Sequence, residues 1–493
     1  MLLLGIDVGT SSIKVSVVDG ASGKTLASAQ HPQMERSIIS LQQGWAEQSP
    51  EQWWADVKAA IIKLNALHRY NPKDIGAIGI SYQMHGLVLL DKEGNVLRNS
   101  IIWCDSRAVS YGEAAFRNIG KTKCLSELLN SPGNFTAAKL AWVKETEPQI
   151  FEKIDKMMLP GDFIAQRLTG NITTTSSALS EAILWNFKEN GVSEEVMNFF
   201  GFDSHIIPEI KNVFAEHGTL RAEVAEELLL QPNIPVTYKA GDQPNNALSL
   251  NVLTPGEVAA TAGTSGVIYG VSDLLFSDPQ SRINSFAHVN HTKQKVSVGV
   301  LLCINGTGIL NKWVKTNTGN LLSYAQMNEA AAFIQEGSDG LLVLPFGNGA
   351  ERMLNNKIVN AHLHNIDFNK HSSSHIYRAT QEGIAFAFRY GLDIMRENGM
   401  KPKVIRAGKA NLFLSEVFTQ AFVNATGVPV EFHDCDGSVG AALGAGIGVG
   451  YFANPSDAFA NRKVLNTIEP TQASLYNELY ENWKHCLEKQ LIG

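Results

Sequence analysis

One short pattern occurs twice in this chain, once near its start and once just past its middle. Residues 5–19, GIDVGTSSIKVSVVD, place strand-forming residues on both sides of a small hydroxyl-rich turn, which is typical of a β-hairpin. Residues 259–273, AATAGTSGVIYGVSD, repeat the pattern about half a chain later. Similarity at this spacing suggests a duplicated domain that faces its copy. A chain of 493 residues also exceeds the size at which one hydrophobic core stops growing, so two domains are expected.

The composition is that of an ordinary globular protein. Hydrophobic residues make up 44%, charged residues 18%, and the net charge is −7 without clustered acids, which argues against nucleic-acid partners and leaves a small neutral or phosphorylated ligand open. The five cysteines are scattered without a CxxC pair, which favours free thiols in a reducing compartment. Neither a signal peptide nor a membrane span is expected, because Asp7 soon interrupts the apolar start. A cytoplasmic protein without a membrane partner is the resulting prediction.

Strand and helix patterns alternate through both halves, which indicates an α/β fold. In the first half, Ser49-Pro50 opens a helical spacing that continues to residue 67, and residues 75–91 predict two buried strands. In the second half, residues 382–399 predict a helix, and residues 401–408 a buried strand. The expected organisation is an N-terminal domain at 1–248, a C-terminal domain at 257–450, and a helical extension at 451–493 that packs outside the core.

The glycine-rich run 436–450, DGSVGAALGAGIGVG, has two interpretations. Its glycines do not follow G-x-G-x-x-G after a strand with a ribose-binding acid downstream, which argues against a dinucleotide site. The favoured interpretation is a helix whose small residues let it pack tightly against a neighbour.

Both hairpin turns have the composition of a phosphate-binding turn. Successive backbone N–H groups in a tight glycine-containing turn form an anion nest, and hydroxyls add donors. Two such turns from opposed domains can hold a triphosphate from both sides, and Asp7 is placed to hold Mg²⁺ through water. The alternative is a pair of ordinary hairpins with small turn residues. The predicted phosphate-binding residues are Gly9, Thr10, Ser11, Gly263, Thr264 and Ser265.

Several motifs together resemble one family. GIDVGTSSIK and TAGTSGVIYG resemble the two phosphate motifs of the FGGY carbohydrate kinases, and GWAEQSPEQWW, QMHG and IIWCDSR extend the similarity over essentially the whole chain. The resemblance implies two ribonuclease-H-like domains of the actin, Hsp70 and hexokinase type, which face each other across a cleft that holds ATP, Mg²⁺ and sugar. It allows a homodimer, since many relatives are dimers. The members that it resembles most convert D-xylulose and ATP into D-xylulose 5-phosphate and ADP.

Asp242 is the candidate general base. It stands at the end of a predicted strand, in YKAGDQPNNALSL, before a helix with Pro244 in its first turn. The residues alone support a helix cap and a base equally, because a carboxylate is favoured at a helix N-terminus. The resemblance decides for the base, since Asp242 matches the catalytic Asp of the family; it is also a second candidate metal ligand. Gln243, a candidate substrate contact, stands where the xylulose-specific members commonly have Asn, and Asp-Gln is more familiar from glycerol kinases.

The predicted sugar contacts lie in two further motifs. Met84 and His85 match the QMHG motif of the ketose pocket, where His85 would bind a hydroxyl and Met84 would contact the carbon face. Without the resemblance, a core Met and His at a strand end would be the better interpretation. Trp103 and Asp105, in WCDSR, fit a wall and a hydroxyl acceptor for the same sugar, and Arg107 is expected to hold their loop by pairing.

The adenosine side departs from the family pattern. Where the family usually has G-G-G-A-x-S, this chain has RAGKAN at 406–411. Gly408 can still approach the nucleotide with its backbone and Asn411 with its amide, and Gly308 is a third candidate. The loop that commonly carries an Asp in the family has Leu179 instead, and no role is assigned to it.

Two alternatives to a ketopentose kinase follow from these residues. The first is a kinase for another sugar or polyol, such as D-ribulose or glycerol. The second is a non-catalytic nucleotide-switch protein of the same fold. The presence of both Asp7 and Asp242 argues against the second alternative.

Overall fold

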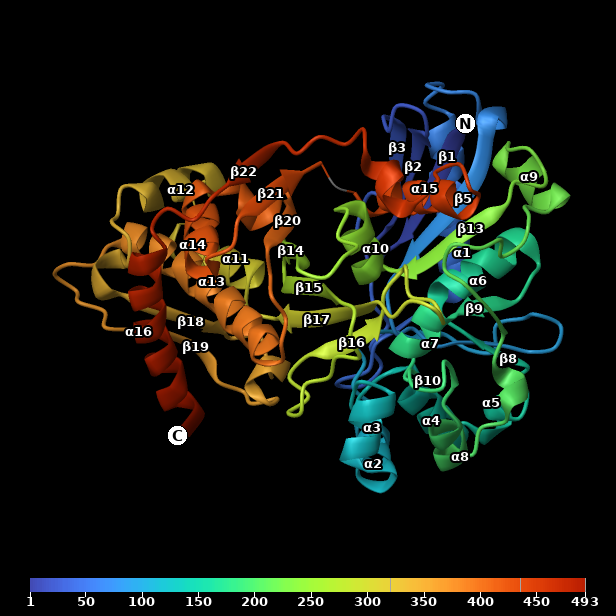
Figure 1. The fold of residues 1–493 in the computed structure, drawn as a ribbon, viewed down its shortest axis with the longest axis horizontal. Coiled ribbons are helices and arrows are strands. Elements are labelled where there is room, and N and C mark those ends of the chain that lie inside the picture. Colours follow the sequence, from blue (N-terminus) through green and yellow to red (C-terminus); the bar gives the residue numbers. More distant parts are fainter. Residues whose placement is uncertain (320, 435, 493) are drawn as a thin grey trace.

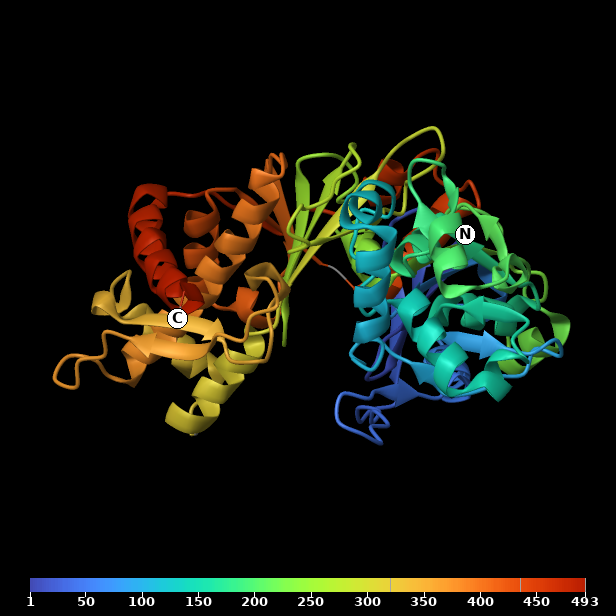
Figure 2. The same cartoon turned by 90° about the horizontal axis from the view of Figure 1, so that it is seen from below.

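The computed structural model describes residues 1–319, 321–434 and 436–492. Figure 1 and Figure 2 show two lobes side by side, with most of the first half of the chain in one lobe and most of the second half in the other. Among the described helices, none combines the length and apolar character needed to cross a membrane.

The first half contains two sets of elements. Its strands are β1 (Leu2–Val8), β2 (Ile13–Asp19), β3 (Thr25–His31), β4 (Glu47–Gln48), β5 (Ile75–Tyr82), β6 (Val88–Leu90), β7 (Ser100–Ile101), β8 (Lys156–Met158), β9 (Thr173–Thr175), β10 (Trp185–Asn186), β11 (Gly191–Val192), β12 (Glu209–Lys211) and β13 (Val236–Gly241). Its helices are α1 (Pro50–Asn65), η1 (Pro72–Asp74), α2 (Val109–Ile119), α3 (Lys121–Glu127), α4 (Thr136–Thr146), α5 (Pro148–Phe151), α6 (Pro160–Thr169), α7 (Ser176–Glu181), α8 (Glu194–Phe200), η2 (Ser204–Ile206), α9 (Ala222–Leu228) and α10 (Asp242–Ser249).

The second half is built in the same way. Its strands are β14 (Glu257–Ala262), β15 (Gly266–Ser272), β16 (Asn284–Ala287), β17 (Val298–Ile304), β18 (Leu342–Phe346), β19 (Asn360–His364), β20 (Val404–Gly408), β21 (Val430–His433) and β22 (Asn466–Ile468). Its helices are α11 (Gly308–Thr318), α12 (Tyr324–Ala332), η3 (Ser338–Gly340), η4 (Arg352–Leu354), α13 (Ser373–Glu397), η5 (Asn411–Leu414), α14 (Glu416–Thr426), α15 (Gly437–Gly448), η6 (Pro455–Phe459) and α16 (Ala473–Ile492).

The two main sheets repeat one topology. The first sheet has the order β3-β2-β1-β5-β13, in which β1 pairs antiparallel with β2 and parallel with β5. The second sheet contains the order β17-β15-β14-β20-β21, in which β14 pairs antiparallel with β15 and parallel with β20. Equal order and direction in the two sheets confirm the duplication that the repeated hairpins predicted.

Helix α15 packs against the first sheet, although it follows the second half in sequence. The sequence placed residues 436–450 in the C-terminal domain, but α15 contacts β1, β2, β5 and β13, and Figure 1 shows it beside them. The contact is close because the strands carry glycines: a Cβ at Gly5 would lie 1.7 Å from the oxygen of Ser438, and one at Gly79 would lie 2.0 Å from the oxygen of Ala441. The prediction of a tightly packed helix is therefore confirmed, and the neighbour of this helix is the sheet of the first half.

The C-terminal helix α16 belongs to the core of the second lobe. The prediction that it packs outside the core was wrong. Tyr476, Tyr480, Trp483 and Leu487 lie on one face of the helix and are almost fully buried. The indole of Trp483 donates a 2.8 Å hydrogen bond to the oxygen of Val343, at β18.

Candidate active site

Three strand ends of the first sheet bring the predicted catalytic residues together. Asp7, on β1, lies opposite Ser81 of β5, and Ser81 lies opposite Ala240 of β13. Because β1, β5 and β13 are parallel, their carboxyl ends meet at one edge of the sheet. The first phosphate turn, the QMHG segment and Asp242 follow directly after these three ends, so residues that are far apart in sequence share this edge.

Asp242 is the first residue of α10, and its carboxyl group carries a raised pKa. The capping position belongs to Gly241, which has no side chain, and the backbone amides of Asp242 and Gln243 interact with the Asp242 carboxyl group. Burial in the site, together with the neighbouring charge of Asp7, raises the pKa of Asp242 to about 7. A carboxyl group with this pKa accepts protons effectively near neutral pH.

Asp7 lies on the face of the first sheet that α15 covers. A Cβ at Gly437, the first residue of α15, would lie 2.5 Å from Oδ2 of Asp7, so only glycine leaves room for the carboxylate. Burial raises the pKa of Asp7, the neighbouring hydroxyl of Ser81 lowers it, the charge of Asp436 raises it, and the charge of Lys14 lowers it. Carboxylates that lie close enough to repel each other form a suitable environment for a divalent cation.

The metal-binding capacity of this edge rests on few protein ligands. Among the residues that the structure describes, no cluster of three or more His, Cys, Asp or Glu side chains is arranged to hold a metal ion. A Mg²⁺ ion beside Asp7 and Asp242 would therefore take most of its ligands from water and phosphate oxygens. This is the usual habit of Mg²⁺, which keeps several of its waters.

The first phosphate turn, between β1 and β2, is held by a polar network. The amide of Gly9 donates to the oxygen of Ser12 at 3.2 Å, which closes the turn. The Thr10 hydroxyl donates to Oε1 of Gln83 at 3.2 Å and accepts from the indole of Trp103 at 3.0 Å. The turn is thereby tied to the segment that also carries Met84 and His85.

The second phosphate turn, between β14 and β15, meets the predicted adenosine residues. The amide of Gly308 donates to the oxygen of Gly263 at 2.9 Å, and a Cβ at Gly308 would lie 2.3 Å from that oxygen. A Cβ at Gly263 would lie 3.6 Å from the amide nitrogen of Asn411. Gly408 ends β20, the strand beside β14. The structure thus gathers Gly308, Gly408 and Asn411 around the turn 263–265.

His85 and Met84 line the edge of the first sheet near Asp242. Met84 is buried, and a Cβ at Gly241 would lie 2.6 Å from its Cγ. The backbone of His85 adopts a left-handed conformation with φ of 64°, and its amide donates to Oε2 of Glu181 at 3.2 Å. Burial, with smaller contributions from Lys139 and Arg352, lowers the pKa of His85 to about 3, so its ring is neutral near pH 7.

Asp105 does not face open space. Its side chain is fully buried, and Oδ2 accepts from the amide of Ala46 at 2.6 Å while Oδ1 accepts from the amide of Arg107 at 2.8 Å. The Arg107 guanidinium pairs with Asp105 at 2.7 Å, as the sequence predicted for this arginine. In this conformation Asp105 holds the loop together, contrary to the predicted role of a hydroxyl acceptor. Trp103, by contrast, is 53% exposed and remains available as a wall.

Two charged residues of this region were missed in the sequence. Glu181, in α7, accepts a 2.7 Å hydrogen bond from the hydroxyl of Tyr82, and burial raises its pKa well above the ordinary value. Arg352, from the second half, lies over the ring of Phe135 at 5.9 Å, and Phe135 packs edge-to-face on His85. One feature of the sequence could have pointed to Glu181, because it is an acid inside the apolar run SEAILW. No feature of the sequence pointed to Arg352.

Comparison with known proteins identifies the family. Residues 2–249 match the N-terminal domain of the FGGY family of carbohydrate kinases, and residues 258–449 match its C-terminal domain. The chain belongs to this family. It is a carbohydrate kinase with the fold that its motifs implied.

Individual relatives agree with this assignment. The chain is 29% identical to the xylulose kinase of Escherichia coli (strain K12) over 460 residues, which cover 92% of this chain and 90% of the relative. It is 30% identical to the xylulose kinase of Bacillus subtilis (strain 168), with coverage of 91% and 89%. The crystal structure of a xylulose kinase from Brucella ovis superposes with a TM-score of 0.90 at 26% identity, over 100% of this chain and 99% of that one.

Proposed function

We propose that this carbohydrate kinase transfers the γ-phosphoryl group of ATP to a hydroxyl of D-xylulose, which yields D-xylulose 5-phosphate and ADP. The observation that carries the proposal is the position of Asp242 and Asp7 at one sheet edge, with a pKa of about 7 at Asp242. That edge also carries the first phosphate turn and Met84 and His85 of the QMHG motif. The names of the relatives support xylulose as the sugar.

Asp242 receives the proton in the proposed reaction. The reacting hydroxyl has a very high pKa, so its proton must leave while the new oxygen–phosphorus bond forms. The bond between the γ-phosphorus and the bridging oxygen of ATP breaks, and ADP leaves with the bonding electrons. Asp242, half-buried at the start of α10, is the carboxylate that we assign to this proton.

The other residues position the reactants. Backbone amides and hydroxyls of the turns 9–11 and 263–265 bind the phosphates, and Gly308, Gly408 and Asn411 contact the adenosine side. Mg²⁺, held through water by Asp7, would supply charge neutralisation at the phosphates, with Asp242 as a second candidate ligand. His85, as a neutral ring, and Met84 contact the sugar, and Gln243 reaches it from beside the base.

The choice of sugar is the testable part of this proposal. Gln243 favours glycerol as a second candidate substrate, because Asp-Gln is more familiar from glycerol kinases, and D-ribulose is a further alternative. A panel of ketoses and polyols in a coupled ADP-release assay separates the candidates. We expect the highest kcat/KM with D-xylulose. A higher value with glycerol or D-ribulose would transfer the assignment to that substrate, and no sugar-dependent ADP release with any member would overturn the kinase reaction itself.

A further inference from the structure

Glu181 is a buried acid beside the candidate active site, and the proposed reaction gives it no role. It is the last residue of the short helix α7, and its side chain is 2% exposed. The carboxyl group lies close to the catalytic edge, because a Cβ at Gly241, the residue before Asp242, would lie 3.4 Å from Oε1. Burial raises the pKa of Glu181 well above its ordinary value, and the charge of Asp242 adds to this rise. Burial of a carboxyl group is unfavourable unless it is hydrogen-bonded, so its partners indicate what it does.

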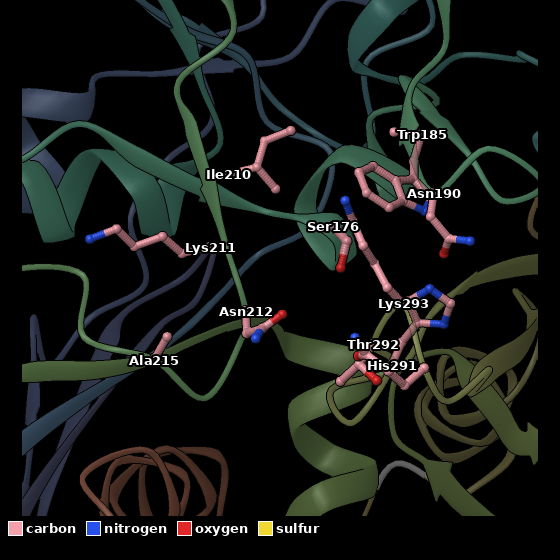
Figure 3. A pocket seen from close by; sticks show the side chains of 12 residues that line it. Ser176, Trp185, Asn190, Ile210, Lys211, Asn212, Ala215, His291, Thr292 and Lys293 are labelled. Carbon is pink, nitrogen blue, oxygen red and sulfur yellow. The ribbon is translucent and has the colours of Figure 1, made fainter.

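Helix α7 is a firm support for this side chain, because strand β16 of the second half holds it. The hydroxyl of Ser177 donates to the oxygen of Ala287 at 2.8 Å, and the amide of Ala287 donates to the hydroxyl of Ser180 at 2.9 Å. Figure 3 shows the start of the helix, at Ser176, beside a pocket that residues of the second half also line. The position of Glu181 is therefore fixed by contacts of its helix as well as by its own.

The backbone of His85 is held in a strained conformation by buried polar groups. Its φ of 64° lies in the left-handed region, which residues other than glycine rarely adopt. Its amide donates to Oε2 of Glu181 at 3.2 Å. Its oxygen accepts from the ammonium of Lys139 at 2.9 Å and from the hydroxyl of Thr136 at 3.2 Å, both on α4. A strained residue that several surrounding contacts maintain is typical of a pre-organised functional site.

The imidazole ring of His85 is oriented by the same glutamate. Nδ1 lies 3.0 Å from the backbone oxygen of Glu181 and 3.6 Å from its Oε2. A carbonyl oxygen can only accept, so Nδ1 must carry the proton of this hydrogen bond. Because the pKa of His85 is lowered to about 3, the ring is neutral near pH 7 and Nε2 has a free lone pair. The side chain is 15% exposed, and none of the described residues is hydrogen-bonded to Nε2.

We infer that Glu181 is a positioning residue of the sugar site, which holds His85 so that Nε2 accepts a hydrogen bond from a hydroxyl of the sugar. The inference rests on the proposed function, because it takes a sugar as the molecule that meets His85. An acceptor at this place requires a hydroxyl that donates, so the site discriminates against an analogue with hydrogen or fluorine at that position. Glu181 acts through His85 and does not itself contact the sugar.

The first test reads the position of the ring proton and needs no turnover. Spectra that connect ¹⁵N and ¹H of the histidine rings are recorded at pH 7, and the signals of His85 are those that His85→Ala removes. We expect a protonated Nδ1 and an unprotonated Nε2 in the free enzyme, and a shift of the Nε2 signal when the best sugar of the panel is added. A proton on Nε2 in the free enzyme, or an Nε2 signal that the sugar does not move, would overturn the inference.

Two variants of Glu181 separate positioning from mere stability. Glu181→Leu leaves the amide of His85 and the hydroxyl of Tyr82 unpaired, so KM for the sugar should rise about tenfold, while kcat and KM for ATP stay within a few-fold. Glu181→Gln should restore most of the affinity, because its oxygen can accept from the His85 amide and its nitrogen can donate to the Tyr82 hydroxyl. In the His85→Ala background, Glu181→Leu should raise KM by at most about twofold, since it acts through His85.

The matched control is Glu127→Leu, because Glu127 is a partly buried acid of the first half that accepts from Asn186 at 3.2 Å. It should leave KM for the sugar unchanged. An equal rise in the control, no rescue by Glu181→Gln, or full additivity with His85→Ala would each overturn the inference. If Glu181→Leu does not fold, Glu181→Gln and the ring spectra decide. Absence of turnover with every sugar would instead refute the proposed function, and the ring proton of the free enzyme is measured independently of it.

Discussion

Asp242→Asn tests the most specific part of the proposed mechanism. The substitution keeps the shape of the side chain and removes its ability to accept the hydroxyl proton. Loss of a general base usually lowers turnover by ~10²–10⁴-fold, so kcat should fall by that factor while the affinity for ATP changes only a few-fold. Steady-state kinetics with the best sugar of the panel and nucleotide binding by calorimetry give both quantities.

The pH dependence supplies a magnitude from the structure. With a pKa of about 7, Asp242 is ionised in about 10% of molecules at pH 6 and about 90% at pH 8. The base works only when ionised, so kcat/KM for the sugar should rise about ninefold between these two pH values. Because the charge of Asp7 contributes to the raised pKa, Asp7→Asn should move this rise to lower pH. Asp242→Asn should remove it.

Stability separates the base from a mere helix cap. The pKa of Asp242 is raised in the folded protein, so the folded state binds this proton more tightly than the unfolded chain does. Ionised Asp242 therefore lowers stability progressively as the pH rises from about 4 to about 7, and Asp242→Asn should melt at or above the wild-type temperature at pH 8. A cap would instead lose about 1 kcal/mol of stability on substitution.

The matched control is Asp203→Asn, because Asp203 is an exposed acid that caps η2 away from the site. It should keep normal turnover. Near-normal turnover of Asp242→Asn, together with a lower melting temperature, would refute the argument for a base.

Four further predictions follow from the geometry. Asp7→Asn should raise the Mg²⁺ concentration needed for half-maximal turnover far more than it changes sugar binding; an unchanged Mg²⁺ titration would remove Asp7 from the site. His85→Ala should raise the KM for the sugar about tenfold, and because the pKa of His85 is about 3, the wild-type KM should show no titration of this ring between pH 5 and 8. Gly79→Ala should lower stability by about 1–3 kcal/mol in thermal melts, since its Cβ would lie 2.0 Å from a backbone oxygen of α15, whereas Gly191→Ala, with nothing within 4 Å, should not. Small-angle scattering should show compaction with sugar plus a non-hydrolysable ATP analogue, and an unchanged radius of gyration would contradict domain closure.

Local patterns in the sequence were sufficient for the sheets and for most of the catalytic edge. The hairpins 5–19 and 259–273 carry alternating strand residues around small turns, and these interactions are local. Asp7 and Asp242 follow strand patterns directly, and parallel strands end at a common edge. The meeting of these residues could therefore be expected before any three-dimensional information was available.

The features that the sequence did not reveal concern partners that lie far apart in the chain. The small residues of 436–450 show that their helix is closely packed, but they carry no information on which sheet it covers, because both sheets offer an apolar face. For α16 the signal was present: Tyr476, Tyr480, Trp483 and Leu487 recur at helical spacing, which is typical of a buried face. Asp105 was predicted to bind a sugar hydroxyl because of its motif. Its oxygens accept hydrogen bonds from the amides of Ala46 and Arg107, which come close only in the folded loop.

The position of α15 has a consequence for the active site. Gly437 begins this helix directly beside the carboxylate of Asp7. Asp7, which we assign to Mg²⁺, is therefore in contact with residues from near the end of the chain. Ser438 extends the same contact, since its hydroxyl lies 2.7 Å from that of Ser16 on β2. The first phosphate turn can therefore reach its final environment only after the second half has been made and has folded back. The duplication produced two sheets of one topology, but the first half alone does not complete the surroundings of Asp7.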